Sequence, residues 1–295
     1  MKMSNSFTLI EILVVIVVIG ILSSFILVGM SSITNSANIA KGQAFANSID
    51  NSLLLSRVSE WKLDNDYNDS WNGKNLTPVN SPTPTSNCVQ GSCYTFNGTT
   101  QYAWVADDDT YFNFGAQMST FVWVKKINDV NNYRRILAQW DTLFLNEASF
   151  RMGTTGPGKK FYVSIYDEDG DNIGSETLLS VFDDKWHCVG FTYNLGVLKV
   201  YVDGTLNNTA EDGSVGNIRN SSTDITIGSG LTNDTGSYFW DGLIDNVRIY
   251  NQAIPTSEIQ QNYYLGINRL FKNTGISSVE FNQRLTELKS NLSNN

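Results

Sequence analysis

The chain has few of the residues that carry most enzyme chemistry. Its 295 residues include a single histidine, His187, which directly follows Trp186 in an alternating run where a structural role is expected. There is no nucleophile elbow and no H-E-x-x-H zinc motif. None of the strand candidates carries the closely spaced carboxylates of a retaining glycosidase. We therefore predict that the chain is not an enzyme and requires no cofactor for catalysis.

Basic residues are also scarce. Lysine and arginine total 20 against 29 aspartates and glutamates, which gives a formal net charge of −9 and a pI near 4.6. Nucleic-acid binding needs a basic surface that neutralises phosphates. The composition therefore argues against nucleic acid as a partner.

Only three cysteines are present. Cys88 and Cys93 lie close together in SNCVQGSCYTF, and we expect a small-loop disulfide that forms outside the cytoplasm. The alternative is two free thiols, since one C-x4-C pair without a second pair makes a poor zinc site. Cys188 lies in an alternating, strand-like run and is predicted to be a small buried apolar side chain.

One long apolar run stands out against this polar background. Residues 7–30 read FTLIEILVVIVVIGILSSFILVGM and contain one charge, Glu11. A helix of about 20 apolar residues spans a bilayer core, and Lys2 on the leading side favours a cytoplasmic start with the rest outside. The apolar core exceeds that of a signal peptide and ends without an A-x-A-like site. An ordinary anchor would not need a carboxylate within the span.

The string Ser6-Phe7-Thr8-Leu9-Ile10-Glu11 resembles the processing site of type IV prepilins and pseudopilins. The resemblance implies a leader at residues 1–6, cleavage by a prepilin peptidase between Ser6 and Phe7, and methylation of the new amine. It also implies that Glu11 pairs with the terminal amine of a neighbouring subunit, which suits a carboxylate in lipid. The family usually has glycine where this chain has Ser6.

After the apolar run the polarity changes without a break. Proline is absent before Pro78, and small or apolar residues recur at helical spacing. We predict one continuous helix over residues 7–58. Residues 7–30 would lie in the membrane or a filament core, and the second half would place one amphipathic face on the following domain.

From Trp61 onward the period becomes two. Short alternating runs separated by Gly, Asn and Asp turns predict a mainly β, antiparallel two-sheet sandwich over residues 59–260. The proline-rich stretch 77–87 is predicted to be a loop. The strand candidates are residues 101–106, 119–126, 160–167, 187–194, 198–204 and 224–230.

Several short motifs in this region, in order, resemble landmarks of laminin-G-like, concanavalin-like jelly rolls. The resemblance implies that Asp245 helps to hold a structural Ca²⁺, with oxygens added by Asp69 and by the backbone around Asn97-Gly98. The alternative is that Asp245 makes only hydrogen bonds within the sheet. The motifs are Glu60-Trp61-Lys62-Leu63 with Asp69, Phe96-Asn97-Gly98 with Tyr102, Trp186-His187, Tyr201-Val202-Asp203-Gly204 and Gly242–Tyr250.

The tail, residues 261–295, returns to helical signals. Thr256 and Ser257 are expected to cap a helix, and a second helix is predicted to start near Ser277, with Glu280 in the position of a capping box. We expect a two-helix appendage packed on the domain, with a contact to a filament or partner as the alternative.

Two functional hypotheses follow. The first is a type IV pilin-like or pseudopilin-like filament subunit that displays an extracellular laminin-G-like domain for adhesion or surface interaction. It would be a single-pass membrane protein with an extracytoplasmic bulk, and its partners would be like subunits or other pilins, the membrane, and glycans or surface proteins. The second is a membrane-anchored carbohydrate-binding module that does not polymerise. Aromatic residues near loops can stack on sugars, although most aromatics in a sandwich are core; these are Trp71, Tyr133, Trp140, Tyr238 and Trp240.

Overall fold

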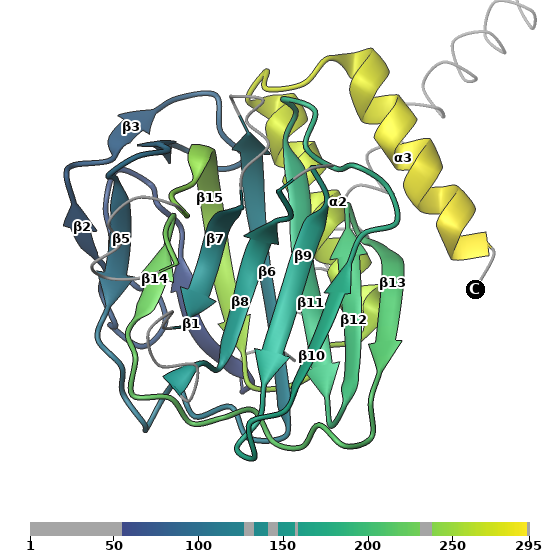
Figure 1. Ribbon diagram of the computed structural model, residues 1–295. Helices are drawn as coiled ribbons and strands as arrows, with labels where there is room; N and C mark the ends of the chain where they lie inside the picture. The colour runs from purple at the N-terminus through teal and green to yellow at the C-terminus, as the bar shows by residue number, and fades with distance from the viewer. Residues whose placement is uncertain (1–54, 127–132, 141–146, 157–158, 231–237, 294–295) are drawn as a thin grey trace, which may run out of the picture. The chain divides into compact units, whose positions relative to one another are not determined.

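The computed structural model describes residues 55–126, 133–140, 147–156, 159–230 and 238–293. The chain divides into two compact units, Met1–Ser52 and Leu53–Asn295, and all described residues belong to the second. That unit is an antiparallel β-sandwich followed by two helices (Figure 1). The mainly β, two-sheet prediction is confirmed.

The first sheet has eight strands, all paired in antiparallel fashion. β15 lies at its centre between β6 and β4, and β1 also pairs with β15. In sheet order the strands are β13 (Thr205–Glu211), β12 (Val197–Val202), β11 (His187–Asn194), β6 (Gln117–Lys126), β15 (Asp241–Tyr250), β4 (Cys93–Asn97) and β3 (Thr83–Thr85), with β1 (Arg57–Trp61) beside β15.

The second sheet has seven strands and packs against the first through their shared core. Alternation in β9 shows how the sequence makes two faces, since Phe161, Val163 and Ile165 enter the core and Tyr162 and Ser164 lie on the other face. In sheet order the strands are β10 (Asn172–Glu176), β9 (Phe161–Tyr166), β8 (Phe150–Thr154), β7 (Arg134–Gln139), β14 (Ile225–Ile227), β5 (Tyr102–Val105) and β2 (Thr77–Val79).

The six strand candidates all contain strands, but the predicted loop at residues 77–87 is wrong. It holds β2 and β3, each the outermost strand of its sheet. Pro78 and Pro84 lie in these edge strands. Proline has no backbone N–H to donate to a sheet, and it is tolerated in an edge strand because one side of that strand pairs with no neighbour. Proline therefore marked two sheet edges.

The predicted end of the long helix near Val58 is also wrong. Arg57 and Val58 belong to β1, which pairs with β15 from Arg57↔Tyr250 to Trp61↔Val247. Val58 is buried and Trp61 is fully buried in the core. This burial and the pairing outweigh local helix propensity. The rest of the predicted helix, residues 7–54, lies outside the described residues.

Two helices follow the last strand, α2 (Thr256–Lys272) and α3 (Ser278–Ser293). Helix α2 begins after Pro255 without a side-chain cap, so the capping role expected of Thr256 and Ser257 is wrong. At α3 half of the capping box forms, because the Ser277 hydroxyl accepts the Glu280 N–H at 3.1 Å while the Glu280 carboxylate binds Arg284.

The helices pack on the outer face of the eight-stranded sheet, which we call the covered face. Trp123 of β6 stacks on Tyr263 of α2 with ring centroids 5.6 Å apart. Gly266 lies so close that an added Cβ would be 2.1 Å from the Trp123 ring. Arg284 of α3 donates to the Trp186 carbonyl at 2.8 Å. The expected two-helix appendage is thus confirmed.

Candidate functional site

The outer face of the seven-stranded sheet, here called the open face, carries no described helix (Figure 1). A cavity of about 460 Å³ lies on it. We call this cavity the arginine pocket; it is lined by Tyr133, Arg135, Arg151, Thr155, Tyr162, Glu176 and Tyr238.

Strand alternation supplies the arginines. In β8, Phe150 and Met152 enter the core, so Arg151 lies on the open face. Arg135 of β7 pairs in register with Gly153 of β8, and a shift in the register separates Arg135 from Leu137. Because Ile136 is in the core, alternation puts Arg135 on the open face, and the β-bulge lets Leu137 follow Ile136 into the core.

Aromatic rings surround both guanidinium groups. The Arg135 Cζ lies 4.9 Å from the Tyr238 ring centroid and 5.4 Å from that of Trp140. The Arg151 Cζ lies 4.7 Å from Trp140 and 5.8 Å from Tyr162. Trp140 is thus shared by the two cations. These cation–π contacts stabilise a charge held away from water.

Neither arginine has a carboxylate partner among the described residues. Glu176 lines the pocket, but its Oε1 binds Lys160 Nζ at 2.6 Å. Arg135 is 3% exposed, and its Nε and Nη1 donate to no described acceptor, nor does Arg151 Nε. Burial and the neighbouring Arg151 charge lower the pKa of Arg135 to about 10. Among the described residues, the pocket therefore holds positive charge without a compensating carboxylate, on an acidic chain.

The adjacent Arg134 shows the contrast. Its Nη1 donates to the carbonyls of Gly98 at 2.6 Å and Phe239 at 2.8 Å. Arg134 thus ties loops to the sandwich, whereas its neighbour Arg135 points into a pocket. One guanidinium is used for structure, and the other keeps donors available.

Glycine shapes one wall of the pocket. Gly174 of β10 lies opposite Ser164 of β9, and a Cβ at this position would be 2.9 Å from the Tyr162 hydroxyl. The absent side chain lets the Tyr162 ring lie across β10 beside Arg151. A flat aromatic surface next to a cation suits a ligand with an apolar ring face and a negative group.

Three of the five aromatic candidates contribute to this site. Tyr133 and Tyr238 line the pocket, and Trp140 lies beneath the arginines. The other two do not contribute, because Trp240 is fully buried in the core and Trp71 lies 5.3 Å from the Arg57 guanidinium. The sequence analysis did not identify Arg135 and Arg151 as site residues. The pattern that could have indicated them is an arginine within an otherwise apolar strand, as in β7 and β8.

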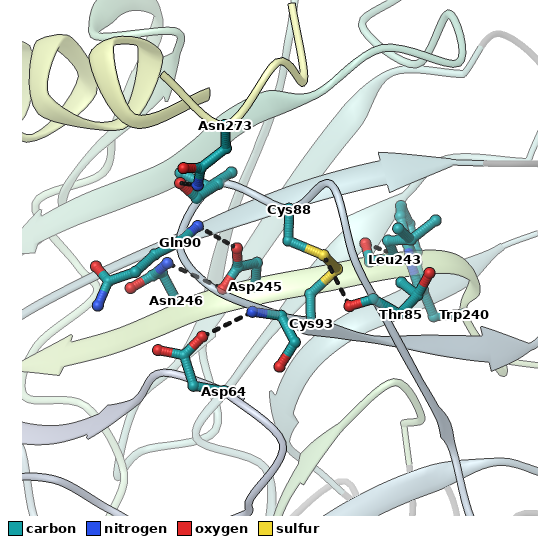
Figure 2. Close-up of a disulfide and its surroundings, with 12 residues drawn as sticks. Asp64, Thr85, Cys88, Gln90, Cys93, Trp240, Leu243, Asp245, Asn246 and Asn273 are labelled. Carbon is teal, nitrogen blue, oxygen red and sulfur yellow. Dashed lines mark hydrogen bonds between the residues drawn. A yellow bond between two sulfur atoms is a disulfide. The ribbon is translucent and has the colours of Figure 1, made fainter. Parts of the chain in front are cut away.

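The predicted disulfide between Cys88 and Cys93 is present, with the Cα atoms 5.8 Å apart. Figure 2 shows Asp245 next to Gln90, which lies in the loop that the disulfide closes. Asp245 is fully buried, and its Oδ2 accepts the Gln90 N–H at 3.0 Å while Oδ1 accepts the Asn246 side chain at 2.9 Å. Burial raises the pKa of Asp245 well above its usual range. The carboxyl is an anchor for the loop.

The other two residues of the calcium hypothesis are used separately. Asp69 accepts backbone N–H groups of Glu60, Trp71 and Lys74. The Asn97 side-chain oxygen accepts the backbone N–H groups of Thr99, Thr100 and Gln101. These residues connect β4 of the first sheet to β5 of the second.

Ca²⁺ needs six to eight oxygen ligands. The side-chain oxygens of Asp245, Asp69 and Asn97 instead accept hydrogen bonds from N–H groups in separate places. Within the described ranges, no group of three or more His, Cys, Asp or Glu side chains is arranged for a metal. Asp245, Asp69 and Asn97 therefore do not fit a shared Ca²⁺ site.

His187 lies between two carboxylates, with Nδ1 2.7 Å from Asp203 and Nε2 2.8 Å from Asp183. Burial alone lowers the pKa of His187, but the two carboxylates outweigh it and raise the pKa above its ordinary value. Asp203 also accepts the Cys188 N–H at 2.9 Å. This geometry supports the structural role expected for His187. Cys188 is buried as predicted.

The processing and assembly residues Ser6, Phe7 and Glu11 lie outside the described residues. Within the described part, neither helix is long and apolar enough to cross a membrane. The predicted span at residues 7–30 falls outside that part as well.

Solved structures share this fold at low sequence identity. Domain 4 of AbnA, a GH43 extracellular arabinanase from Geobacillus stearothermophilus solved with arabinotriose, is 17% identical, with TM-score 0.54 over 70% of this chain and 97% of that domain. The binding domain of Paraclostridial Mosquitocidal Protein 1 is 16% identical, with TM-score 0.60 over 73% of this chain and 53% of that one.

The binding domain of botulinum neurotoxin DC, solved with SialylT, is 15% identical, with TM-score 0.56 over 74% of this chain and 52% of that one. The chain thus spans about half the length of the two toxin domains. These likenesses establish the fold alone. A search of curated proteins finds no match to the sequence.

Family models match two separate parts of the sequence. Residues 1–27 match the prokaryotic N-terminal methylation motif, in agreement with the resemblance carried by Ser6 to Glu11. Residues 97–260 match the concanavalin A-like lectin/glucanases superfamily, in agreement with the sandwich. The chain therefore belongs to the concanavalin A-like lectin/glucanases superfamily and joins that domain to a type IV pilin-like N-terminal methylation motif.

Proposed function

We propose that the protein is a type IV pilin-like or pseudopilin-like filament subunit that displays its sandwich as a binding domain for surface glycans or surface proteins. The observation that carries the binding role is the arginine pocket, an aromatic-walled cavity on the face that the described helices, α2 and α3, leave open. Its size suits one or two sugar rings. The absence of catalysis and of a cofactor requirement stays a prediction.

The assembly role rests on the N-terminal motif. In this proposal the peptidase removes residues 1–6, and the chain then enters a filament through the helix that begins at Phe7. Glu11 pairs with the amine of a neighbouring subunit, because a carboxylate in lipid is stabilised by a cation there. The subunit's partners are then like subunits or other pilins.

Mass spectrometry of the N-terminal peptide, from protein isolated in its native envelope, tests processing. We expect a chain that begins at methylated Phe7. A Ser6→Gly variant, which restores the residue usual in the family, is the matched control and is expected to be processed at least as fully. A wild-type chain that keeps residues 1–6 while Ser6→Gly is cleaved would contradict the assembly role.

Assembly itself is tested with Glu11→Ala and the conservative control Glu11→Asp. We expect Ala at this position to abolish incorporation into sheared filaments and Asp to retain part of it. Wild-type incorporation of Glu11→Ala would contradict the pairing role. An unprocessed, monomeric chain that still binds glycans would favour the alternative, a membrane-anchored carbohydrate-binding module that does not polymerise.

A further inference from the structure

We propose that the arginine pocket binds a sugar residue that bears a carboxylate, so that its ligands are acidic glycans containing uronic or sialic acids. The inference deepens the binding role proposed above and rests on it. It does not depend on filament assembly, since every residue used lies in the sandwich.

The first argument is charge. Removing one partner of a buried ion pair is strongly destabilising because it leaves a charge uncompensated. Arg135 is such a buried charge in the wild-type protein, since it is 3% exposed and pairs with no described carboxylate. Arg151 adds a second cation beside the same residue, Trp140. Neither forms an ion pair with a described carboxylate. A ligand that brings an anion would supply the missing compensation.

The second argument is hydrogen bonding. Buried donors are nearly always satisfied in folded proteins, yet Arg135 Nε, Arg135 Nη1 and Arg151 Nε have no described acceptor. The Trp140 Nε1 beside them is also without one. A carboxylate offers about four lone-pair sites, and charge-assisted bonds to arginine are among the stronger ones.

The third argument is shape, which separates a sugar from a simple anion. Tyr133, Tyr162 and Tyr238 line the same cavity, and its volume of about 460 Å³ exceeds what acetate or phosphate would fill. Tyr133 is 52% exposed, which leaves a ring face available at the rim. Aromatic faces accept the C–H face of a sugar ring, and the arginines then select rings with a negative substituent.

The test uses the full chain in detergent on an array of neutral, carboxylated and sulfated glycans. Titration calorimetry then compares trigalacturonate with its methyl ester, and sialyllactose with lactose, since each pair differs mainly in charge. We expect carboxylated glycans to bind, and in at least one pair the neutral member to bind tenfold or more weakly. Affinity should also fall as salt rises.

Two variants locate the site. Arg151→Gln is expected to reduce binding of the acidic glycan to the level of its neutral counterpart, while Arg151→Lys keeps part of it. Lys199→Gln, which removes one positive charge from β12 of the other sheet, is the control and should leave binding unchanged. Unchanged near-ultraviolet circular dichroism would establish that the variants are folded.

The outcomes separate this inference from the proposed function. Equal binding of charged and neutral members in both pairs, or a preference for sulfated glycans alone, overturns the carboxylate inference but leaves glycan binding in place. Failure of every glycan to bind overturns both. Competition by acetate as strong as by the acidic glycan would show a simple anion site and would also overturn the inference.

Discussion

The covered face and the open face of the sandwich use the same residue types for different ends. On the covered face, Trp123 is sealed by Tyr263 and Gly266 of α2, and Arg248 is neutralised by Glu60 at 2.7 Å and bound to Asn262 of α2 at 3.2 Å. On the open face, Trp140 contacts Arg135 and Arg151, and neither arginine has a carboxylate partner among the described residues.

The difference is that the covered face pairs its arginine with a carboxylate, whereas the open face holds two arginines without a described carboxylate partner, as the proposed ligand site would require. A tryptophan and an arginine under a helix contribute to stability through burial and pairing. The same residue types without a covering helix hold an uncompensated charge, which costs free energy of folding. Such local destabilisation is typical of functional sites. Substitutions on the two faces should therefore separate stability from binding.

The largest effect is expected for Trp123→Ala. The change removes the ring that α2 packs on and leaves a cavity, so the free energy of unfolding should fall by about 3–5 kcal/mol. Trp104→Ala, at a half-buried, open-face position of β5, is the control and should cost less than half as much. Urea unfolding of the full chain in detergent, followed by tryptophan fluorescence, measures both. Equal losses would remove the distinction between the faces.

Glu60→Gln is expected to have the next largest effect. Burial alone raises the pKa of Glu60, but Arg248 and Arg57 outweigh it and lower the pKa to about 2, from 4.5 in the unfolded chain. The ionised group therefore contributes about 3 kcal/mol above pH 4.5, which is lost as the pH falls toward 2.

Urea unfolding of wild type and Glu60→Gln between pH 2.5 and 7 checks this. The two stability curves should lie far apart at pH 7 and converge toward the acid end. Glu176→Gln, which removes the half-exposed partner of Lys160 on the open face, should cost at most about 1 kcal/mol. Parallel curves for Glu60→Gln and wild type would contradict the pairing account.

His187→Gln should have a smaller effect with the opposite pH dependence. Because the folded-state pKa of His187 is raised by Asp203 and Asp183, the charged ring stabilises the fold below its unfolded pKa of about 6.5. That contribution is lost as the pH rises through the folded-state value. The stability difference between wild type and variant should therefore be larger at pH 6 than at pH 9. A difference independent of pH would contradict the charged bridge.

The smallest effect on stability is expected for Arg151→Gln. The variant loses cation–π contacts but also relieves repulsion from Arg135, so the free energy of unfolding should change by at most about 0.5–1 kcal/mol. Arg134→Gln is the adjacent comparison, because Arg134 binds two loop carbonyls, and it should destabilise more. A larger loss for Arg151→Gln than for Arg134→Gln would mean that the pocket arginine is structural.

The sequence by itself determined the outline of this protein. The period-two runs predicted the strands, because a half-buried strand must alternate, and the C-x4-C spacing predicted the disulfide. The string from Ser6 to Glu11 and the strand landmarks indicated both families, since these local motifs survive without any knowledge of distant contacts.

Tertiary structure decided everything that depends on distant partners. Whether Arg57 is helical or extended depended on Tyr250 across the sheet, and Asp245 became a buried anchor because Gln90, 155 residues away, donates to it. The arginine pocket arises from β7, β8, β9 and β10 and the segment at Tyr238, which meet only in the folded sheet. Sequence periodicity fixes which face a side chain takes, but only packing fixes which face stays open.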